Sequence, residues 1–392
     1  MKVLFITRGY PSEKDPMKGN YEAVQAKAIA AKGHEVSVIG VKVHSLLHLH
    51  EMRKYQHCRV QGMNVYTIES FMIFDRLVPF IPKTFLPKVN FWLFNRAFKK
   101  LFKIYLAENG MPDVVHIHSL HSAPPVVYLK KHNHVPVVIT EHWSKVKYQN
   151  VPARLKNRID FWGNECYCHA DSVVAVSDSL AQAIHERFGI QCRVINNMVQ
   201  DRFFKHSKAM NQHRGFRFIS VGSLFPIKGY DVLIEAFSKI ARDREVSLDI
   251  VGKGTENERL QQLIAKYGQE ERIHLTGVKT PDEVADMLET SDCFVLASKS
   301  ETFGIVYIEA MAKGLPVIAT RCGGPEEFVN KDNGLLVDVG NCDALTEAMV
   351  YMMDHKNLYN KEKIRQFCLD HYSESAIADQ IIKEYHKVIK NK

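Results

Sequence analysis

Residues 293–320 read CFVLASKSETFGIVYIEAMAKGLPVIAT and contain a complete strand–helix–strand repeat. The apolar runs 293–298 and 316–320 have the length and composition of buried strands. Between them, residues 303–313 predict a helix with Thr302 as its N-cap and a Gly-Leu-Pro turn at its end. Strands joined by a helix in this way predict a parallel sheet covered by helices.

The same alternation of short apolar runs and helical patterns extends along the chain in both directions. It restarts with residues 216–222, FRFISVG, after a polar and charged segment at 197–214. A chain of 392 residues is too long for one hydrophobic core. The sequence therefore predicts two doubly wound α/β domains, 1–198 and 199–372, with a helix over 373–392 that rejoins the first domain.

Composition places the chain among globular proteins and argues against a membrane span. Apolar residues make up 46% and charged residues 24% of the sequence. No apolar run approaches the roughly 20 residues that cross a bilayer, and no signal-peptide pattern follows Lys2. The eight cysteines are scattered, which is typical of reduced thiols. We expect a cytoplasmic protein.

The positive charge is concentrated in the first half of the chain. Residues 1–200 hold 26 Lys and Arg against 15 Asp and Glu, whereas residues 201–392 hold 26 against 29. Within 76–107 there are seven basic residues and no acidic ones, interleaved with aromatic residues. A helix over about 88–106 would carry a basic face and an aromatic face, as an interfacial helix at an anionic membrane does. The alternative is a helix that packs against the rest of the domain and keeps its basic side in water. Nucleic acid could bind the same basic patch, but the sequence contains no nucleic-acid-binding motif that supports this.

The loops after the predicted strands lack the common nucleotide-binding motifs, but one of them carries a lysine at a position that could bind phosphate. Neither G-x-G-x-x-G after the first strand nor G-x-x-x-x-G-K-[ST] is present. Lys228 follows the strand 216–221 and precedes a helix, so it is positioned to neutralise a phosphate beside the helix amides. The alternative is a solvated loop lysine.

Two carboxylates bracket the start of the helix predicted at 303–313. Glu301 lies in the loop at the carboxyl end of a buried strand, and Glu309 lies about one and a half turns into the helix. The free amides near Phe303 and Gly304 would attract a negative group, while the two carboxylates would bind hydroxyls. A nucleotide sugar has a negative diphosphate flanked by sugar hydroxyls, which matches this arrangement of amides and carboxylates. The alternative is that Glu301 and Glu309 are two ordinary surface glutamates.

Three histidines of the first predicted domain lie in or directly after strand-like runs. His142 directly follows the strand-like run VVIT, where it could bond a sugar hydroxyl or serve only as a loop histidine. His116 and His118 alternate in a strand pattern with no carboxylate close by, so we expect no metal site there.

Taken together, these stretches resemble the retaining glycosyltransferases of family 4, also called group 1, which have the GT-B fold of two Rossmann-like domains facing across a cleft. The resemblance is strongest over about 171–340. It is carried by VGSLFPIKGYDVLIEAF, LDIVGKGTENERL and above all SETFGIVYIEAMAKGLPVIATRCGGPEEF, which matches the family's E-x7-E motif at Glu301 and Glu309.

The resemblance implies roles for individual residues. It assigns sugar hydroxyls to Glu301, ribose to Glu309 and the donor diphosphate to Lys228, while Ser223 stands where the family commonly has arginine. His142 matches the histidine that faces the donor sugar. The remaining matches to donor-binding positions are backbone sites: Phe303, Gly304, Gly222, Gly252 and Gly19.

The resemblance also implies an activity. We expect transfer of a hexose-type sugar from a nucleoside-diphosphate sugar, most simply a UDP-sugar, to a glycan or lipid-linked acceptor in capsule, lipopolysaccharide or glycolipid synthesis. Neither half contains D-x-D, so no metal and no cofactor beyond the donor substrate are expected. An epimerase of the same fold and a non-catalytic nucleotide-sugar-binding protein are the alternatives. The acceptor would place residues 76–107 at the inner face of the plasma membrane.

Overall fold

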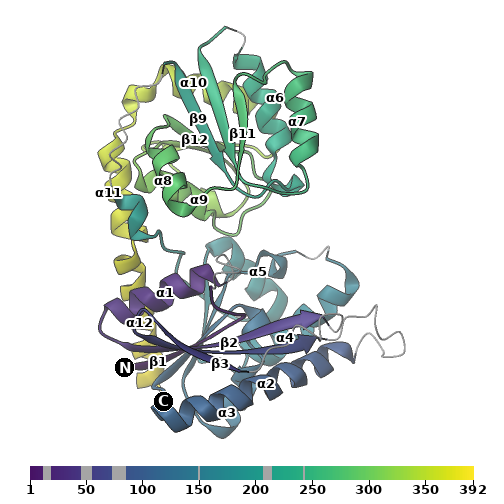
Figure 1. Ribbon diagram of the computed structural model, residues 1–392, viewed down its shortest axis with the longest axis vertical. Coiled ribbons are helices and arrows are strands. Elements are labelled where there is room, and N and C mark those ends of the chain that lie inside the picture. The colour runs from purple at the N-terminus through teal and green to yellow at the C-terminus, as the bar shows by residue number, and fades with distance from the viewer. Residues whose placement is uncertain (12–18, 46–54, 73–84, 149–150, 206–213, 242) are drawn as a thin grey trace. The chain divides into compact units, whose positions relative to one another are not determined.

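The computed structural model divides into two compact units (Figure 1). It describes residues 1–11, 19–45, 55–72, 85–148, 151–205, 214–241 and 243–392. Unit 1 comprises residues 1–196 together with 377–392, and unit 2 comprises residues 197–376. The domain boundaries expected from the sequence lie within four residues of these.

The described part of unit 1 contains a sheet of eight strands in the order β3-β4-β2-β1-β5-β6-β7-β8. The strands are β1 (Lys2–Thr7), β2 (Glu35–Ser45), β3 (Gln56–Val60), β4 (Met63–Met72), β5 (Val114–His118), β6 (Val137–Glu141), β7 (Ser172–Ala175) and β8 (Arg193–Val194). Every neighbouring pair is parallel except β3–β4. The central strands β5 and β6 are buried along their whole length, including the polar residues His116, His118, Thr140 and Glu141.

Helices cover both faces of this sheet. They are α1 (Asn20–Ala31), α2 (Leu86–Asn109), α3 (Pro125–His132), α4 (Ala153–Tyr167), α5 (Asp178–Phe188) and α12 (Glu374–Lys390). Figure 1 shows α1 and α12 on one face and α2 and α3 on the other, and α2 also contacts α4. A salt bridge of 2.7 Å between Lys32 and Asp379 joins α1 to α12.

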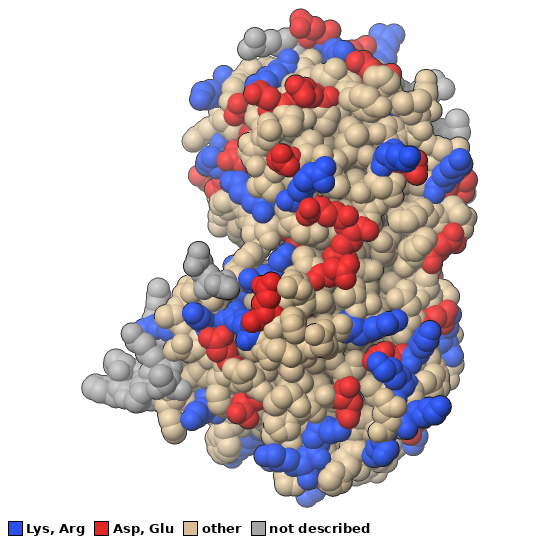
Figure 2. Space-filling view, turned by 180° about the vertical axis from the view of Figure 1, so that it is seen from behind, with Lys and Arg blue, Asp and Glu red and all other residues tan. Residues whose placement is uncertain are grey.

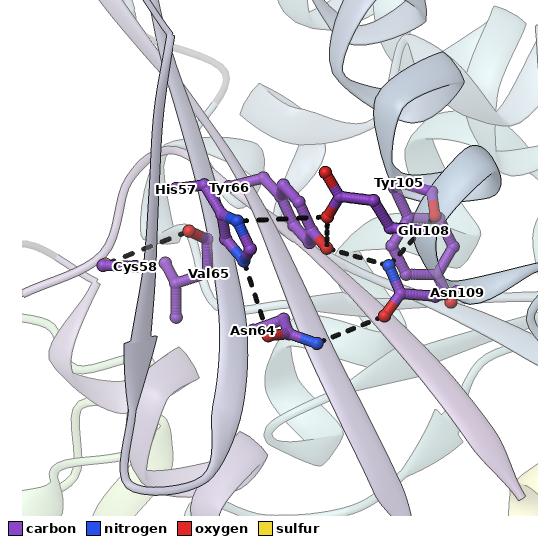
Figure 3. Close-up of polar contacts among 8 residues, drawn as sticks. All are labelled: His57, Cys58, Asn64, Val65, Tyr66, Tyr105, Glu108 and Asn109. Carbon is purple, nitrogen blue, oxygen red and sulfur yellow. Dashed lines mark hydrogen bonds and ion pairs between the residues drawn. The ribbon is translucent and has the colours of Figure 1, made fainter.

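The hairpin β3–β4 forms one edge of the sheet and is fastened to the end of α2 (Figure 3). Its two-residue turn, Gln61-Gly62, has positive φ at both positions, as a tight hairpin requires. The Tyr66 hydroxyl donates to Glu108 Oε2 at 2.7 Å, and Asn109 Nδ2 donates to the Tyr66 oxygen at 2.8 Å. Burial and this bond to Glu108 raise the pKa of Tyr66 to about 12. The network fixes the C-terminal end of α2 against the sheet.

The C-terminal helix contributes buried contacts to unit 1. The Tyr385 hydroxyl is 2.5 Å from His116 Nδ1, and the Ser172 hydroxyl donates to Glu384 at 2.8 Å. Both Tyr385 and His116 are fully buried. Residues 377–392 are therefore part of the core of unit 1, although 180 residues of unit 2 separate them from the rest of it.

The described part of unit 2 contains a parallel sheet of six strands in the order β11-β10-β9-β12-β13-β14. The strands are β9 (Phe216–Val221), β10 (Val246–Val251), β11 (Ile273–Gly277), β12 (Cys293–Leu296), β13 (Val317–Thr320) and β14 (Gly334–Val337). The direction of strand progression reverses between β9 and β12, which pair at Phe218 and Cys293. In doubly wound sheets the carboxyl ends of such a pair are the usual place for a ligand.

The helices of unit 2 form two layers around this sheet. They are α6 (Tyr230–Ile240), α7 (Asn257–Lys266), α8 (Pro281–Glu289), α9 (Ile305–Ala312), α10 (Cys342–Asp354) and α11 (Lys361–Tyr372). Helix α6 contacts α7 and α10, whereas α9 contacts α8 and α11. No helix among the residues described in either unit is long and apolar enough to cross a membrane.

Candidate active site

The two central strands of unit 2 bring Lys228 and Glu301 together. Lys228 follows β9 and Glu301 follows β12, and Lys228 Nζ lies 2.6 Å from Glu301 Oε1. Their side chains are 18% and 10% exposed, so the pair is mostly removed from water. Sequence analysis singled out both residues as donor-binding candidates but did not predict that they form an ion pair.

The loop that carries Lys228 is shaped by a glycine that no other residue can replace. A 3₁₀ turn over Pro226–Lys228 ends at Gly229, whose φ is +64°. A β-carbon on Gly229 would lie 2.0 Å from the carbonyl oxygen of Ala297, which belongs to the loop after β12. The Lys299 N–H donates to the Ile227 carbonyl at 2.7 Å. The two loops are thus held side by side, and Lys228 is aimed at the end of β12.

Glu301 is fixed by its neighbours in the same loop layer. The Ser298 hydroxyl donates to Glu301 Oε1 at 2.6 Å, and the Glu301 N–H donates to the Cys322 carbonyl at 3.2 Å. Glu301 also forms an isolated parallel bridge with Gly323, in the loop after β13. The Glu301 carboxylate is therefore held by the loops after β9 and β12, and its backbone by the loop after β13, which leaves the side chain a narrow range of positions.

The helix after Glu301 begins later than the sequence predicted. Helix α9 starts at Ile305 with Gly304 as its N-cap, in a left-handed conformation at φ +95°, and no side chain caps it. The prediction that Thr302 is the N-cap is wrong, because the bridge at Glu301 keeps the backbone extended there. The Phe303 side chain is buried against Phe328 and Tyr372, so only its backbone is available to a ligand. The helix amides that face the loop layer belong to Ile305 and its successors.

Glu309 occupies a different environment from Glu301. It lies in the second turn of α9 and is partly exposed. Burial raises its pKa to about 8, and the charge of Arg202 opposes this shift. Arg202 belongs to the 3₁₀ turn Asp201–Phe204, which contacts α8 and α9.

The remaining donor-site candidates in unit 2 lie on the same rim of the sheet. Gly222 and Gly252 directly follow β9 and β10, where the Gly222 N–H donates to the Val251 carbonyl at 3.0 Å. The Gly252 N–H donates to Gly277 at 2.9 Å. Ser223 is exposed next to Gly222. Together with Lys228 and Glu301, these backbone positions line consecutive strand ends.

In unit 1, His142 and Gly19 lie at the carboxyl side of the sheet. Gly19 precedes α1 with φ +71°. His142 directly follows β6, and its Nε2 is 3.2 Å from His118 Nδ1. The His118 ring stacks on His142 and on Phe5. Burial, with the neighbouring histidines adding to it, lowers the pKa of His118 well below its ordinary value, so His118 is neutral.

His116 and His118 share one buried face of β5, with ring centres 4.2 Å apart. His116 is bonded to Thr140 at 2.7 Å as well as to Tyr385, and burial, assisted by the charge of His142, lowers its pKa to about 3. These contacts make His116 a structural histidine of the core. Within the described ranges, no group of three or more His, Cys, Asp or Glu residues has the geometry of a metal site.

Glu141 is a buried carboxylate that the sequence analysis missed. Its Oε1 accepts the backbone N–H groups of His142 at 3.0 Å and Trp143 at 2.7 Å. Its Oε2 accepts the N–H of Leu120 at 2.8 Å and the hydroxyl of Tyr167 at 2.7 Å. Burial raises the pKa of Glu141, and these four bonds counteract the shift. Glu141 thereby holds the loops after β5 and β6 in place. Its sequence signal was a glutamate at the end of a buried, mostly apolar strand.

Helix α2 has a buried aromatic face and an exposed basic face. The aromatic side chains expected at a membrane surface are in fact core residues, together with Leu101: Phe94, Phe98, Phe102 and Tyr105. The exposed stripe consists of Phe85, Lys88, Trp92, Arg96, Lys99, Lys100 and Lys103. Figure 2 shows Lys and Arg side chains gathered on the surface of unit 1. Arg76 and Lys83, from the same predicted segment, lie outside the described residues.

Comparisons with known proteins agree with this arrangement along the chain. The family model described as Glycosyltransferase Family 4 matches residues 21–203, and the one described as Glycosyl transferases group 1 matches residues 201–383. N-acetyl-alpha-D-glucosaminyl L-malate synthase of Bacillus anthracis is 28% identical over 301 residues, which are 73% of this chain and 77% of that protein.

Solved structures give the same fold. Sucrose-phosphate synthase from Thermosynechococcus elongatus superposes with a TM-score of 0.76 at 21% identity, over 100% of this chain and 99% of that one. HepE of Anabaena, solved in complex with UDP-glucose, gives a TM-score of 0.69 at 19% identity, over 99% of this chain and 100% of that one. The chain belongs to the group 1, family 4 glycosyltransferases and has their GT-B fold.

Proposed function

We propose that this glycosyltransferase moves a hexose-type sugar from a nucleoside-diphosphate sugar to a hydroxyl of a glycan or lipid-linked acceptor, with retention of anomeric configuration. The observation that carries the proposal is the contact of Lys228 with Glu301 at the point where strand order reverses in unit 2. An ammonium group and a carboxylate side by side suit a ligand that presents a diphosphate next to sugar hydroxyls. When such a donor binds, the ammonium turns from Glu301 to the phosphate.

The chemistry follows from these groups. The bond between the anomeric carbon and the diphosphate oxygen breaks, and a bond to the acceptor oxygen forms on the same face of the sugar. The acceptor proton passes to the departing phosphate oxygen, so no protein nucleophile is needed. Lys228 and the first amides of α9 stabilise the charge on the leaving diphosphate, a role that elsewhere falls to a metal ion. Without a D-x-D sequence, we propose that transfer needs no metal.

The donor we propose first is a UDP-sugar, and a GDP-sugar second. Support comes from the Anabaena protein HepE, which was solved with UDP-glucose and has the same fold. Glu309 supplies the group for the ribose in this proposal, and Gly222 and Gly252 allow the nucleotide to approach the backbone. His142 of unit 1 is proposed to face the donor sugar.

A panel of radiolabelled UDP-, GDP- and ADP-sugars, incubated with membrane lipid extract in EDTA, tests the reaction. We expect one nucleotide class to support transfer, the product to keep the donor's anomeric configuration by NMR, and Glu301→Ala to abolish turnover. An inverted product would contradict the retaining mechanism, and activity only after metal addition would contradict the metal-free one. Epimerisation without an acceptor, or binding without turnover, would support the two alternative functions.

We further propose that the basic stripe of α2 rests on an anionic membrane surface, which would present a lipid-linked acceptor. Trp92 and Phe85 are 57% and 56% exposed, and the Arg96 guanidinium lies 5.5 Å from the Trp92 ring centre. Exposed tryptophan beside several basic residues is typical of interfacial helices. Each Lys or Arg near such a surface contributes about 1 kcal/mol.

Vesicle sedimentation separates this surface from a merely solvated one. We expect the protein to bind vesicles containing phosphatidylglycerol but not pure phosphatidylcholine, and Lys99→Glu/Lys103→Glu to release it. The matched control is Lys266→Glu, an exposed lysine at the end of α7 in unit 2. Equal binding to both vesicle types, or release by the control variant, would argue for the solvated basic face.

A further inference from the structure

A cluster of cationic and aromatic side chains lies at the carboxyl end of the unit 1 sheet. Arg8 follows β1 and His121 follows β5, and these two strands pair in register through Ile6 and Ile117. Trp143 follows β6, the next strand along. The ring centres of His121 and Trp143 are 3.7 Å apart. Three neighbouring strand ends therefore contribute to one cluster.

Arg158 reaches the same cluster from helix α4. Its guanidinium carbon lies 6.0 Å from the Trp143 ring centre and 5.7 Å from that of Trp162. Aromatic faces of this kind orient a guanidinium without neutralising its charge. Arg158 is only partly exposed, while Arg8 is exposed. Together they offer two guanidinium groups, one held between aromatic rings and one exposed to solvent, to the same ligand.

The cationic groups of this cluster act on one another. Burial, then the charges of Arg8 and Arg158, lower the pKa of His121 well below its ordinary value. Burial, then Arg8, lowers the pKa of Arg158. His121 is therefore neutral, and the like charges are those of Arg8 and Arg158, whose mutual repulsion costs free energy. A bound anion would relieve that cost, and clusters of this kind are more frequent at functional sites than elsewhere.

The backbone that carries the cluster is held in one position. Glu141 accepts the N–H of Leu120, which precedes His121, and the N–H of Trp143, whose ring belongs to the cluster. Ser119 has φ +64° and ψ 153°, a conformation rare for any residue but glycine. Its N–H donates to the Thr140 carbonyl at 2.7 Å. A strained and heavily bonded loop of this type indicates pre-organisation for a ligand.

We propose that this cluster binds an anionic group of the acceptor, a carboxylate or a phosphate, between Arg8, Arg158 and His121, with Trp143 as a platform for the adjoining sugar ring. The acceptor would then be an acidic sugar, such as a uronic acid, or a phosphorylated one, and not a neutral glycan. The inference rests on the proposed transferase function and names the class of its acceptor. Arginine suits both anions because its donors bind two oxygens at once.

Paired probes test the proposal on the full-length protein. Methyl glucuronide, methyl glucoside and inorganic phosphate are titrated separately, with binding followed by histidine ring NMR signals, that of His121 being assigned with His121→Asn. We expect the glucuronide, the phosphate or both to shift the His121 signal at concentrations where the neutral glucoside does not. The anion that binds more tightly identifies carboxylate or phosphate as the recognised group.

Variants separate specific binding from general positive charge. We expect Arg8→Gln and Arg158→Gln each to weaken anion binding about ten- to hundredfold, the range of a charged hydrogen bond. Arg154→Gln, an exposed arginine one turn earlier on α4, is the matched control and should leave binding unchanged. Arg8 is exposed, so its substitution tests the cluster even if Arg158→Gln does not fold.

The outcomes also distinguish this inference from the proposed function. Unchanged UDP affinity in Arg8→Gln and Arg158→Gln is expected, because the donor site is placed in unit 2. A loss of UDP affinity would overturn the inference by assigning the cluster to the donor diphosphate. The inference would also be overturned if glucuronide and glucoside bind equally and phosphate does not bind. The proposed function, by contrast, would be refuted if neither the wild type nor any variant binds a nucleotide.

Discussion

Replacing Lys228 with methionine should destabilise unit 2 and weaken donor binding at once. The substitution removes the ammonium 2.6 Å from Glu301 and leaves the carboxylate, whose side chain is 10% exposed, with Ser298 as a donor to the same oxygen. Breaking a fully buried ion pair costs about 3–5 kcal/mol. Because the Lys228 side chain keeps 18% exposure, water screens part of the charge, and we expect a loss of about 1–3 kcal/mol.

Thermal unfolding with and without UDP measures both effects. For a unit of roughly 180 residues, a loss of about 2 kcal/mol lowers the melting temperature by about 4–8 °C. The double variant Lys228→Met/Glu301→Gln should lose less than the two single variants combined, because it leaves no uncompensated charge. UDP affinity of Lys228→Met should fall about ten- to hundredfold.

Lys313→Met is the matched control for this prediction. Lys313 Nζ lies 2.8 Å from Glu289 and its side chain is 4% exposed, so its loss also breaks a buried pair in unit 2. We expect comparable destabilisation but unchanged UDP affinity. The reasoning is refuted if Lys228→Met keeps both its melting temperature and its UDP affinity, or if Lys313→Met weakens UDP binding equally.

Three further predictions concern single side chains. Burial raises the folded-state pKa of Glu309 to about 8, above its unfolded value, so its stabilising contribution is complete below about pH 4 and is lost as pH rises through 8. Glu309→Gln should therefore flatten the fall in urea stability between about pH 5 and 8. Glu141→Ala should cost about 3–5 kcal/mol in unit 1 by leaving four donors without their acceptor, whereas Glu165→Ala, at an exposed position on α4, should cost less than about 0.5 kcal/mol in the same thermal assay. Tyr66→Phe should cost about 1 kcal/mol and speed hydrogen exchange in β3 and β4, and unchanged exchange would show that Glu108 holds α2 without it.

Much of the fold could be predicted because its strands are short apolar runs bounded by turn residues. Strand β9 covers 216–221 of the predicted run 216–222, and β12 begins at Cys293, where the first predicted strand begins. The hairpin β3–β4 was missed, although Gln61-Gly62 between two alternating runs is a signal for a tight turn. Long-range contacts were beyond reach, since no local pattern pairs Tyr385 with His116.

The candidate site shows the same division between local and distant information. The motif placed Lys228 and Glu301 at strand ends, but their contact depends on the pairing of β9 with β12. The start of α9 was misplaced because the bridge from Glu301 to Gly323 comes from a different loop. For α2, the periodicity predicted a basic and an aromatic face but not which of them would pack against the sheet. In the structure the aromatic face, including Phe98, is the buried one.

The return of residues 377–392 to unit 1 has a consequence for biosynthesis. The ribosome releases residues 1–196 first, yet the partner of His116 is Tyr385, at the far end of the chain. At about 5–20 residues per second, the 180 residues of unit 2 take roughly 10–40 s to translate. During that interval the second unit can complete its core before the first, whose buried histidine and Ser172 still lack their partners on α12. The order of maturation would then be the reverse of the order of synthesis.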